Sequence, residues 1–196
     1  MNYNPENMKY KPIILICGES GSGKSTLAEE LEIQCGLKAI PSYTTRPPRY
    51  ENEKGHTFIT NKEFDKLNNI IAYAETTGAR YCVTQEMFEN EDYTLYVIDN
   101  SGIKYLKENY KGQRPMYVVY ITCPLRQRYE RIIKRVDNNP DPIGFALERI
   151  VHDAVEFKDV DYNIKIENSD GNFSDAFASL CTYYNMFVNV VTNNEE

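Results

Sequence analysis

Residues 18 to 25 read Gly18-Glu19-Ser20-Gly21-Ser22-Gly23-Lys24-Ser25 and satisfy the pattern GxxxxGK(S/T). An apolar run from Ile13 to Cys17 precedes this loop, and a helical pattern follows it until Gly36. A strand, a glycine loop and a helix in this order are the context that a phosphate-binding loop requires. Backbone N–H groups of such a loop surround a phosphate, and the helix N-terminus adds positive potential. The segment therefore predicts a site for a nucleoside triphosphate.

Each residue type in the loop suits one part of that site. Lys24 is expected to bridge the β- and γ-phosphates, and the Ser25 hydroxyl to bind Mg²⁺. No NKxD motif for guanine is present, because Asn61-Lys62-Glu63-Phe64 lacks the final aspartate, so ATP is the expected donor. The residues expected at ATP are Gly18, Ser20, Gly21, Ser22, Gly23, Lys24, Ser25 and Thr26.

Strand-like and helix-like segments alternate along the rest of the chain. Further strands are predicted at Thr94 to Ile98, Met116 to Thr122 and Tyr162 to Ile166. Helices are predicted after a cap at Ser101, from Leu125 to Val136, from about Ile143 to Lys158, and from Ser174 to about Val190. The third of these helices is expected to bury Leu147, Ile150, Val151, Ala154 and Phe157. The pattern predicts an α/β fold, with a parallel sheet of the P-loop NTPase type covered by helices on both faces.

Two segments interrupt this alternation. Residues 41 to 90 combine a Pro/Arg-rich stretch, a short helix boxed by Thr60 and Glu63, and two strands that turn at Thr77-Gly78. Residues 137 to 144 are polar and proline-rich between two arginine-bearing helices. We therefore expect a core domain of residues 1–40, 91–127 and 150–196, an inserted α+β lobe of residues 41–90, and a lid of residues 128–149.

The inserted lobe begins with a second candidate anion site. Arg46 and Arg49 lie three residues apart in a proline-stiffened segment, and guanidinium groups suit bidentate phosphate binding. A solvated basic loop is the alternative interpretation. Asp99, at the end of a predicted strand, could hold the water shell of Mg²⁺ or contact an acceptor, or it could simply cap a helix.

At this point the sequence resembles the guanylate kinase family. Residues 42 to 49, Ser42-Tyr43-Thr44-Thr45-Arg46-Pro47-Pro48-Arg49, are similar to the GMP-binding pattern Ser-x-Thr-Thr-Arg-x-Pro-Arg of that family. The resemblance continues through Gly55 to Phe58, Gly78 to Tyr81 with the helix-starting Thr84, and Val97 to Asp99 with Gly102. It covers nearly the whole chain, and its combined motifs are more specific than any one of them.

The resemblance implies a role for each matched residue, as follows. Ser42, Arg46, Arg49, Tyr81, Thr84 and Asp99 would bind GMP, with Ser42 or Thr84 nearer the base, and Asp99 would reach the metal through water. Lys24, Arg131, Arg135 and Arg149 would be catalytic, and Asn168 would lie near the adenine, although a turn role suits Asn168 equally well. Arg128, Arg131 and Arg135 share one helix face; Arg126 and Arg128 are interpreted as ordinary surface arginines.

The chain departs from the family at the base-reading positions. Ala72 replaces a glutamate that reads guanine, Val83 replaces a common serine, and Tyr50-Glu51 replaces small residues before a glutamate. Glu75, Glu51 or Glu53 could substitute for the missing acid. His56 stands near the position of a tyrosine that contacts base or phosphate.

These features predict a guanylate kinase that transfers the γ-phosphate of ATP to GMP or dGMP, in purine nucleotide supply. A related kinase for another nucleoside monophosphate or a phosphorylated sugar is the alternative, and a non-catalytic module that binds phosphopeptides is a third. A net charge of −7 argues against a nucleic acid polymer, and no apolar run approaches the roughly 18 residues of a membrane helix. We expect a cytoplasmic monomer or homodimer, with five scattered, reduced cysteines.

Overall fold

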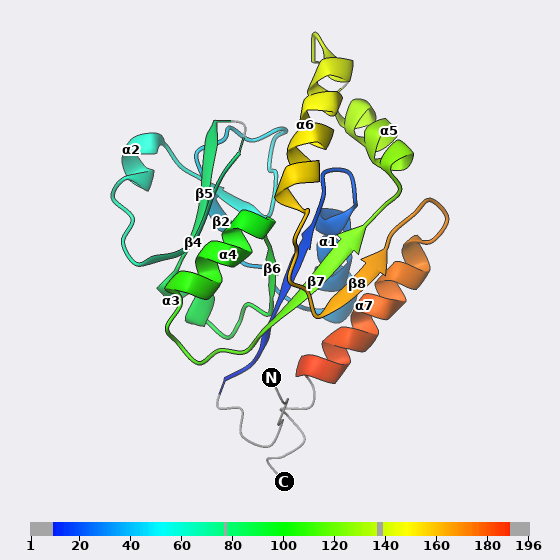
Figure 1. The fold of residues 1–196 in the computed structure, drawn as a ribbon. Helices are drawn as coiled ribbons and strands as arrows, with labels where there is room; N and C mark the ends of the chain where they lie inside the picture. Colours follow the sequence, from blue (N-terminus) through cyan, green and yellow to red (C-terminus); the bar gives the residue numbers. More distant parts are fainter. Residues whose placement is uncertain (1–9, 77, 137–138, 189–196) are drawn as a thin grey trace.

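The computed structural model describes residues 10–76, 78–136 and 139–188 (Figure 1). The strands are β1 (Ile13–Gly18), β2 (Ser42–Thr44), β3 (His56–Phe58), β4 (Ile70–Thr76), β5 (Ala79–Thr84), β6 (Leu95–Val97), β7 (Met116–Thr122) and β8 (Ile164–Glu167). The helices are α1 (Lys24–Cys35), α2 (Asn61–Phe64), α3 (Gln85–Glu89), α4 (Asn100–Asn109), α5 (Leu125–Arg135), α6 (Pro142–Glu156) and α7 (Phe173–Val188).

Four strands form a parallel sheet in the order β6-β1-β7-β8, which confirms the predicted fold class. The central strand β1 is buried on both faces. Its side chains alternate, so that Ile13, Leu15 and Cys17 join one apolar cluster and Ile14 and Ile16 join another. Ile103 and Leu106 of α4 complete the first cluster, and Leu27, Leu31 and Leu180 of α1 and α7 complete the second. Helices therefore cover both faces (Figure 1).

A second sheet, in the order β3-β2-β5-β4, is built from residues 42 to 84. In this sheet β2 and β3 are parallel, whereas β5 is antiparallel to both β2 and β4. Thr60 and Glu63 form the expected capping box at α2. Helix α4 packs against β4 and against β1, so it connects the two sheets (Figure 1). The boundaries of the core, lobe and lid stay a prediction.

The predicted buried face of α6 was wrong in three of its five positions. Leu147 and Val151 are 51% and 67% exposed, and Ala154 is exposed as well. Phe157 is buried and Ile150 half-buried, as the pattern indicated. The helix instead buries Ala146 and Asp153, because the Asp153 carboxylate binds the loop after β1. A polar contact thus overrides the apolar pattern in orienting this helix.

Several element boundaries also differ from the prediction by one or two residues. Helix α4 begins two residues earlier, with Asp99 and not Ser101 as N-cap, while the N–H of Ser101 donates to Glu156 Oε1 at 2.5 Å. Strand β8 begins at Ile164, so Tyr162 lies before it. The predicted turn residue Thr77, lid residues 137 and 138, and the expected helix end at Val190 lie outside the described residues. None of the described helices combines the length and apolarity needed to cross a membrane.

Candidate active site

The loop between β1 and α1 is held in a conformation that depends on glycine. Gly21 and Gly23 have φ angles of 78° and 86°, in the left-handed region that favours glycine. A Cβ on Gly21 would lie 2.7 Å from the backbone oxygen of Arg128, and one on Gly23 would overlap the Asn168 side chain. The loop is therefore packed closely against α5 on one side and against the segment after β8 on the other.

One cavity, of about 360 Å³, opens along this loop and the start of α1. Its lining residues are Gly21, Gly23, Lys24, Ser25, Thr26, Arg131, Lys134 and Arg135. Five of these were expected at ATP and two among the catalytic arginines, whereas Lys134 was not singled out. Of the other residues expected at ATP, Ser22 is fully buried, and a Cβ on Gly18 would overlap the backbone oxygen of Ile121. Gly18 and Ser22 therefore support the conformation of the loop and are not among the described residues that line this cavity.

A second cavity, of about 300 Å³, is lined by residues from both sheets and from the helices beside them. Five of the six residues expected at the acceptor line it, namely Ser42, Arg46, Arg49, Tyr81 and Asp99. Thr84 is not among its lining residues, because its hydroxyl caps α3 by accepting from Met87 N. The cavity also contains groups that the sequence did not single out, among them Tyr73, Thr76, Tyr96 and Phe145.

The two cavities meet at three residues. Lys24, Ser25 and Arg135 line both of them. A group bound along the loop and a group bound between the sheets would therefore come together at an ammonium, a hydroxyl and a guanidinium. This is the arrangement that the transfer of an anionic group between two ligands needs.

Positive charge is concentrated at this junction. Burial and the nearby charge of Arg49 lower the pKa of Arg135 to about 10, and Arg149 and Arg46 act in the same direction. Burial and the charge of Arg46 likewise lower the pKa of Arg49. Mutual repulsion of this kind marks a site that an anion would stabilise.

Arg46 is held by a carboxylate and keeps one donor free. Its two terminal nitrogens each donate to Glu53 at 2.9 Å, and the Glu53 side chain is only 5% exposed. Burial opposes ionisation, but this bond to Glu53 raises the pKa of Arg46 overall. Within the described part of the chain, the buried Nε of Arg46 has no hydrogen-bond partner. A buried, unpaired donor is uncommon and indicates a missing acceptor such as a phosphate oxygen.

Ser25 and Asp99 supply oxygen ligands suited to Mg²⁺. Both line the second cavity, and the Asp99 side chain makes no hydrogen bond to the N-terminus of α4, so it does not act as a side-chain cap. Burial lowers the pKa of the Lys24 ammonium, and the carboxylates of Asp99 and Asp153 oppose that effect. Hydroxyl and carboxylate oxygens are the hard ligands that Mg²⁺ prefers, so these residues fit the ion.

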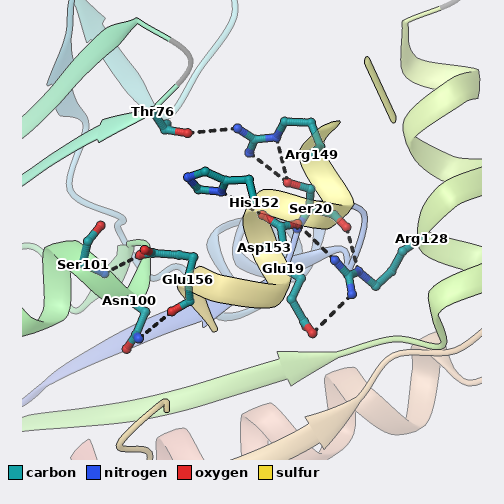
Figure 2. Close-up of polar contacts among 10 residues, drawn as sticks. All are labelled: Glu19, Ser20, Thr76, Asn100, Ser101, Arg128, Arg149, His152, Asp153 and Glu156. Carbon is teal, nitrogen blue, oxygen red and sulfur yellow. Dashed lines mark hydrogen bonds and ion pairs between the residues drawn. The ribbon is translucent and has the colours of Figure 1, made fainter. Parts of the chain in front are cut away.

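Arg149 and Arg131 both reach the loop. Arg149 donates to the Ser20 hydroxyl at 2.8 and 3.1 Å and to the Thr76 hydroxyl at 3.0 Å, so it connects the loop with β4 (Figure 2). Arg131 donates to the Gly21 carbonyl at 3.1 Å. The Asn168 side-chain amide donates to the Ser22 carbonyl at 2.8 Å, so Asn168 stabilises the loop conformation. Asn168 is not among the described residues that line the first cavity.

Arg128 is not the surface residue that the sequence suggested. It is 6% exposed and contacts the loop and Asp153. Sequence reasoning missed Asp153 altogether, since nothing in the local pattern distinguishes it from the other acids of α6, Glu148 and Glu156. Spacing offered one clue for Arg128, because it shares a helix face with Arg131 and Arg135.

The base-reading departures are placed away from the second cavity. Ala72 and Val83 are fully buried in the apolar cluster beneath α4 and do not line the cavity. His56 does line it: its Nδ1 lies 3.0 Å from the Ser42 hydroxyl, and burial followed by the charge of Arg46 lowers its pKa to about 4. Among the described lining residues, Asp99 carries the one carboxylate.

The fold defines a P-loop nucleotide-binding protein, with a second cavity that is lined by arginines. Comparison with known proteins agrees: the AAA domain family model matches residues 14–152. A guanylate kinase of Bartonella henselae is 30% identical over 172 residues, covering 83% of this chain and 77% of that protein. One of Koribacter versatilis is 31% identical over 172 residues, covering 80% and 72%.

The chain belongs to the guanylate kinase family. A solved guanylate kinase structure from Anaplasma phagocytophilum matches with a TM-score of 0.54 at 22% identity, covering 91% of this chain and 89% of that one. At that identity the match supports the fold alone. Family and fold together support a guanylate kinase-like P-loop kinase.

Proposed function

We propose that this protein transfers the γ-phosphoryl group of ATP to GMP or dGMP. The observation that carries the proposal is the junction of the two cavities at Lys24, Ser25 and Arg135. ATP along the loop would direct its γ-phosphate toward this junction, and a monophosphate held by Arg46 and Arg49 would approach it from the other side. The family membership supports the same pair of substrates.

Most of the catalytic effect would come from positioning and charge. The phosphate oxygen of the acceptor is already a nucleophile, so no carboxylate base is required. Lys24, Arg135 and Arg149 would stabilise negative charge on the transferring group, and Arg46 would offer its free Nε to the acceptor phosphate. Mg²⁺ bound by Ser25, with Asp99 acting through water, would neutralise charge on the donor phosphates.

The lobe of residues 41–90 and the lid of residues 128–149 are part of this proposal. Arg149, on α6, already contacts both Ser20 and Thr76, and therefore both sides of the second cavity. Closure over two anions would exclude water and favour transfer to the acceptor over hydrolysis.

A coupled assay of ADP formation tests the proposal. Purified protein with Mg·ATP is given GMP, dGMP, AMP, CMP and UMP in turn, and turnover with GMP or dGMP should exceed that with the others. Saturable turnover of another nucleotide, with none for GMP and dGMP, would contradict the proposed acceptor.

A different acceptor is the second candidate, and the position of Ala72 and Val83 favours it. Both lie in the apolar core, where neither can hydrogen-bond a base, and Glu75 is exposed and accepts from Tyr73 Oη at 3.0 Å. A site that hydrogen-bonds guanine rejects other bases strongly only when it has such partners. Adding phosphorylated sugars to the same panel decides between the two candidates.

A further inference from the structure

Ser20, the third residue of the phosphate-binding loop, is held at three of its polar atoms (Figure 2). Its N–H donates to Asp153 Oδ2 at 2.7 Å, and its carbonyl accepts from Arg128 Nε at 3.0 Å. Its hydroxyl accepts from Arg149 at 2.8 Å. These partners come from α5 and α6, and the loop itself supplies none of them.

Arg128 and Asp153 form one buried ion pair across α5 and α6. Arg128 Nη2 donates to Asp153 Oδ2 at 3.0 Å, and the two side chains are 8% and 2% exposed. The remaining Arg128 nitrogen, Nη1, donates to Glu19 Oε1 at 3.2 Å. The same Asp153 oxygen therefore binds both the guanidinium and the Ser20 amide. Because a buried ion pair seldom adds net stability, its geometry calls for another explanation.

The geometry of the Arg128–Asp153 pair is explained by the Ser20 backbone groups that it orients. Holding the amide and carbonyl of Ser20 fixes the peptide planes on either side of it, and Gly21 then packs directly against the Arg128 backbone. The amides that would surround a phosphate follow immediately. The charge of Asp153 is neutralised by Arg128, so a carboxylate can stand beside a polyphosphate site with less repulsion.

We propose that Arg128 and Asp153 are positioning residues that set the conformation of the loop at Ser20 for ATP binding. They thereby also position the Ser20 hydroxyl, which accepts hydrogen bonds from Arg149. The inference rests on the proposed function only in that the loop binds ATP. Neither residue touches a substrate in this scheme, and both act through Ser20.

Calorimetric titration with Mg·ATP and thermal unfolding, run on the same variants of the full chain, separate positioning from structural support. Asp153→Ala removes the acceptor of the Ser20 amide and should raise the Kd for Mg·ATP about tenfold to a hundredfold. Asp153→Asn retains an oxygen for that amide, so its Kd should stay within about threefold of the original. Both variants should lower the Tm, since both remove the buried carboxylate at Arg128 Nη2 and leave Glu19 as the charged partner of that guanidinium.

A double variant, Arg128→Met with Asp153→Leu, replaces the pair by apolar groups and should have a higher Tm than either single variant at position 153, although Glu19 and Ser20 lose their partners. Its Kd for Mg·ATP should nevertheless stay raised by about tenfold or more, because Ser20 is no longer held. Arg126→Ala and Glu148→Gln change exposed residues of the same two helices and should alter neither quantity.

Two results would overturn the proposal: equal Kd values for the alanine and asparagine variants at position 153, or a double variant that binds Mg·ATP like the original. If the double variant fails to fold, the comparison at position 153 decides. A protein that binds Mg·ATP but phosphorylates no monophosphate would refute the proposed function and leave this comparison intact. Failure of the original protein to bind Mg·ATP would refute both.

Discussion

Replacing Arg135 by alanine should slow the reaction without weakening the fold. Arg135 lies at the junction of the two cavities, and partial burial beside Arg49 lowers its pKa well below the ordinary value of arginine, to about 10. A difference of this size corresponds to about 3 kcal/mol of unfavourable interaction. The residue is exposed, however, and solvent screening reduces this to about 1 kcal/mol.

The direction of the stability change follows from the protonation state of Arg135 that the folded protein disfavours, which is the charged one. Because the folded pKa is lower than the unfolded one, the charged arginine destabilises the ligand-free protein at every pH below about 10. Removing it should therefore raise the Tm by about 2 to 4 °C. In the reaction, the same charge would face the transferring phosphoryl group, so its loss should lower kcat by about 10² to 10³.

Differential scanning fluorimetry and the coupled assay measure the two effects on one preparation. Arg126→Ala is the matched control, because Arg126 is an 89% exposed arginine on the same helix and faces neither cavity. Adding GMP should stabilise the original protein more than the Arg135→Ala variant. A variant that is less stable than the original and keeps its kcat would refute this account of the junction.

Three further changes test other parts of the site. Lys24→Ala should raise the Kd for Mg·ATP by about 100-fold in calorimetry, because the loop loses its point charge, and an unchanged Kd would exclude Lys24 from the site. Glu53→Gln should raise the KM for the acceptor about tenfold and leave the KM for ATP unchanged, since Arg46 is no longer held at two nitrogens. Replacing the exposed Glu51 by glutamine is the control. Equal acceptor KM values for Glu53→Gln and the original protein would reject the role of Glu53 in orienting Arg46. The pKa of His56 is about 4 in the folded protein and 6.5 in the unfolded chain. The free energy of unfolding should therefore be greatest above pH 6.5 and should be lower by about 1 to 2 kcal/mol at pH 5. Urea unfolding of His56→Gln should show a weaker pH dependence than that of the original protein, and equal pH dependence in the two would count against this explanation.

Local sequence was enough to predict the parallel sheet and the phosphate-binding loop. The run Ile13 to Cys17 is apolar throughout, as is typical of a strand buried on both faces. The glycines of the loop pattern indicate its backbone conformation, because Gly21 and Gly23 adopt positive φ angles that favour glycine. The capping box at Thr60 and Glu63 was equally readable, since both partners lie within one helical turn.

Helix orientation was predicted less well. The apolar stripe of α6 predicted that Leu147 and Val151 would be buried, yet both are exposed. The contact between Asp153 and Ser20 joins residues 133 positions apart, and periodicity within one helix contains no information about it. The same reason explains why Arg128 was taken for a surface residue.

The sequence by itself determined the strand, the glycine loop and the residue types suited to binding two anions, because these depend on short-range pattern and side-chain chemistry. Only the tertiary structure decided that Lys24, Ser25 and Arg135 lie where two cavities meet, that Glu53 holds Arg46, and that Ala72 is enclosed in the core. Those outcomes depend on how separate elements pack and on which charges burial brings together, and no single segment carries that information.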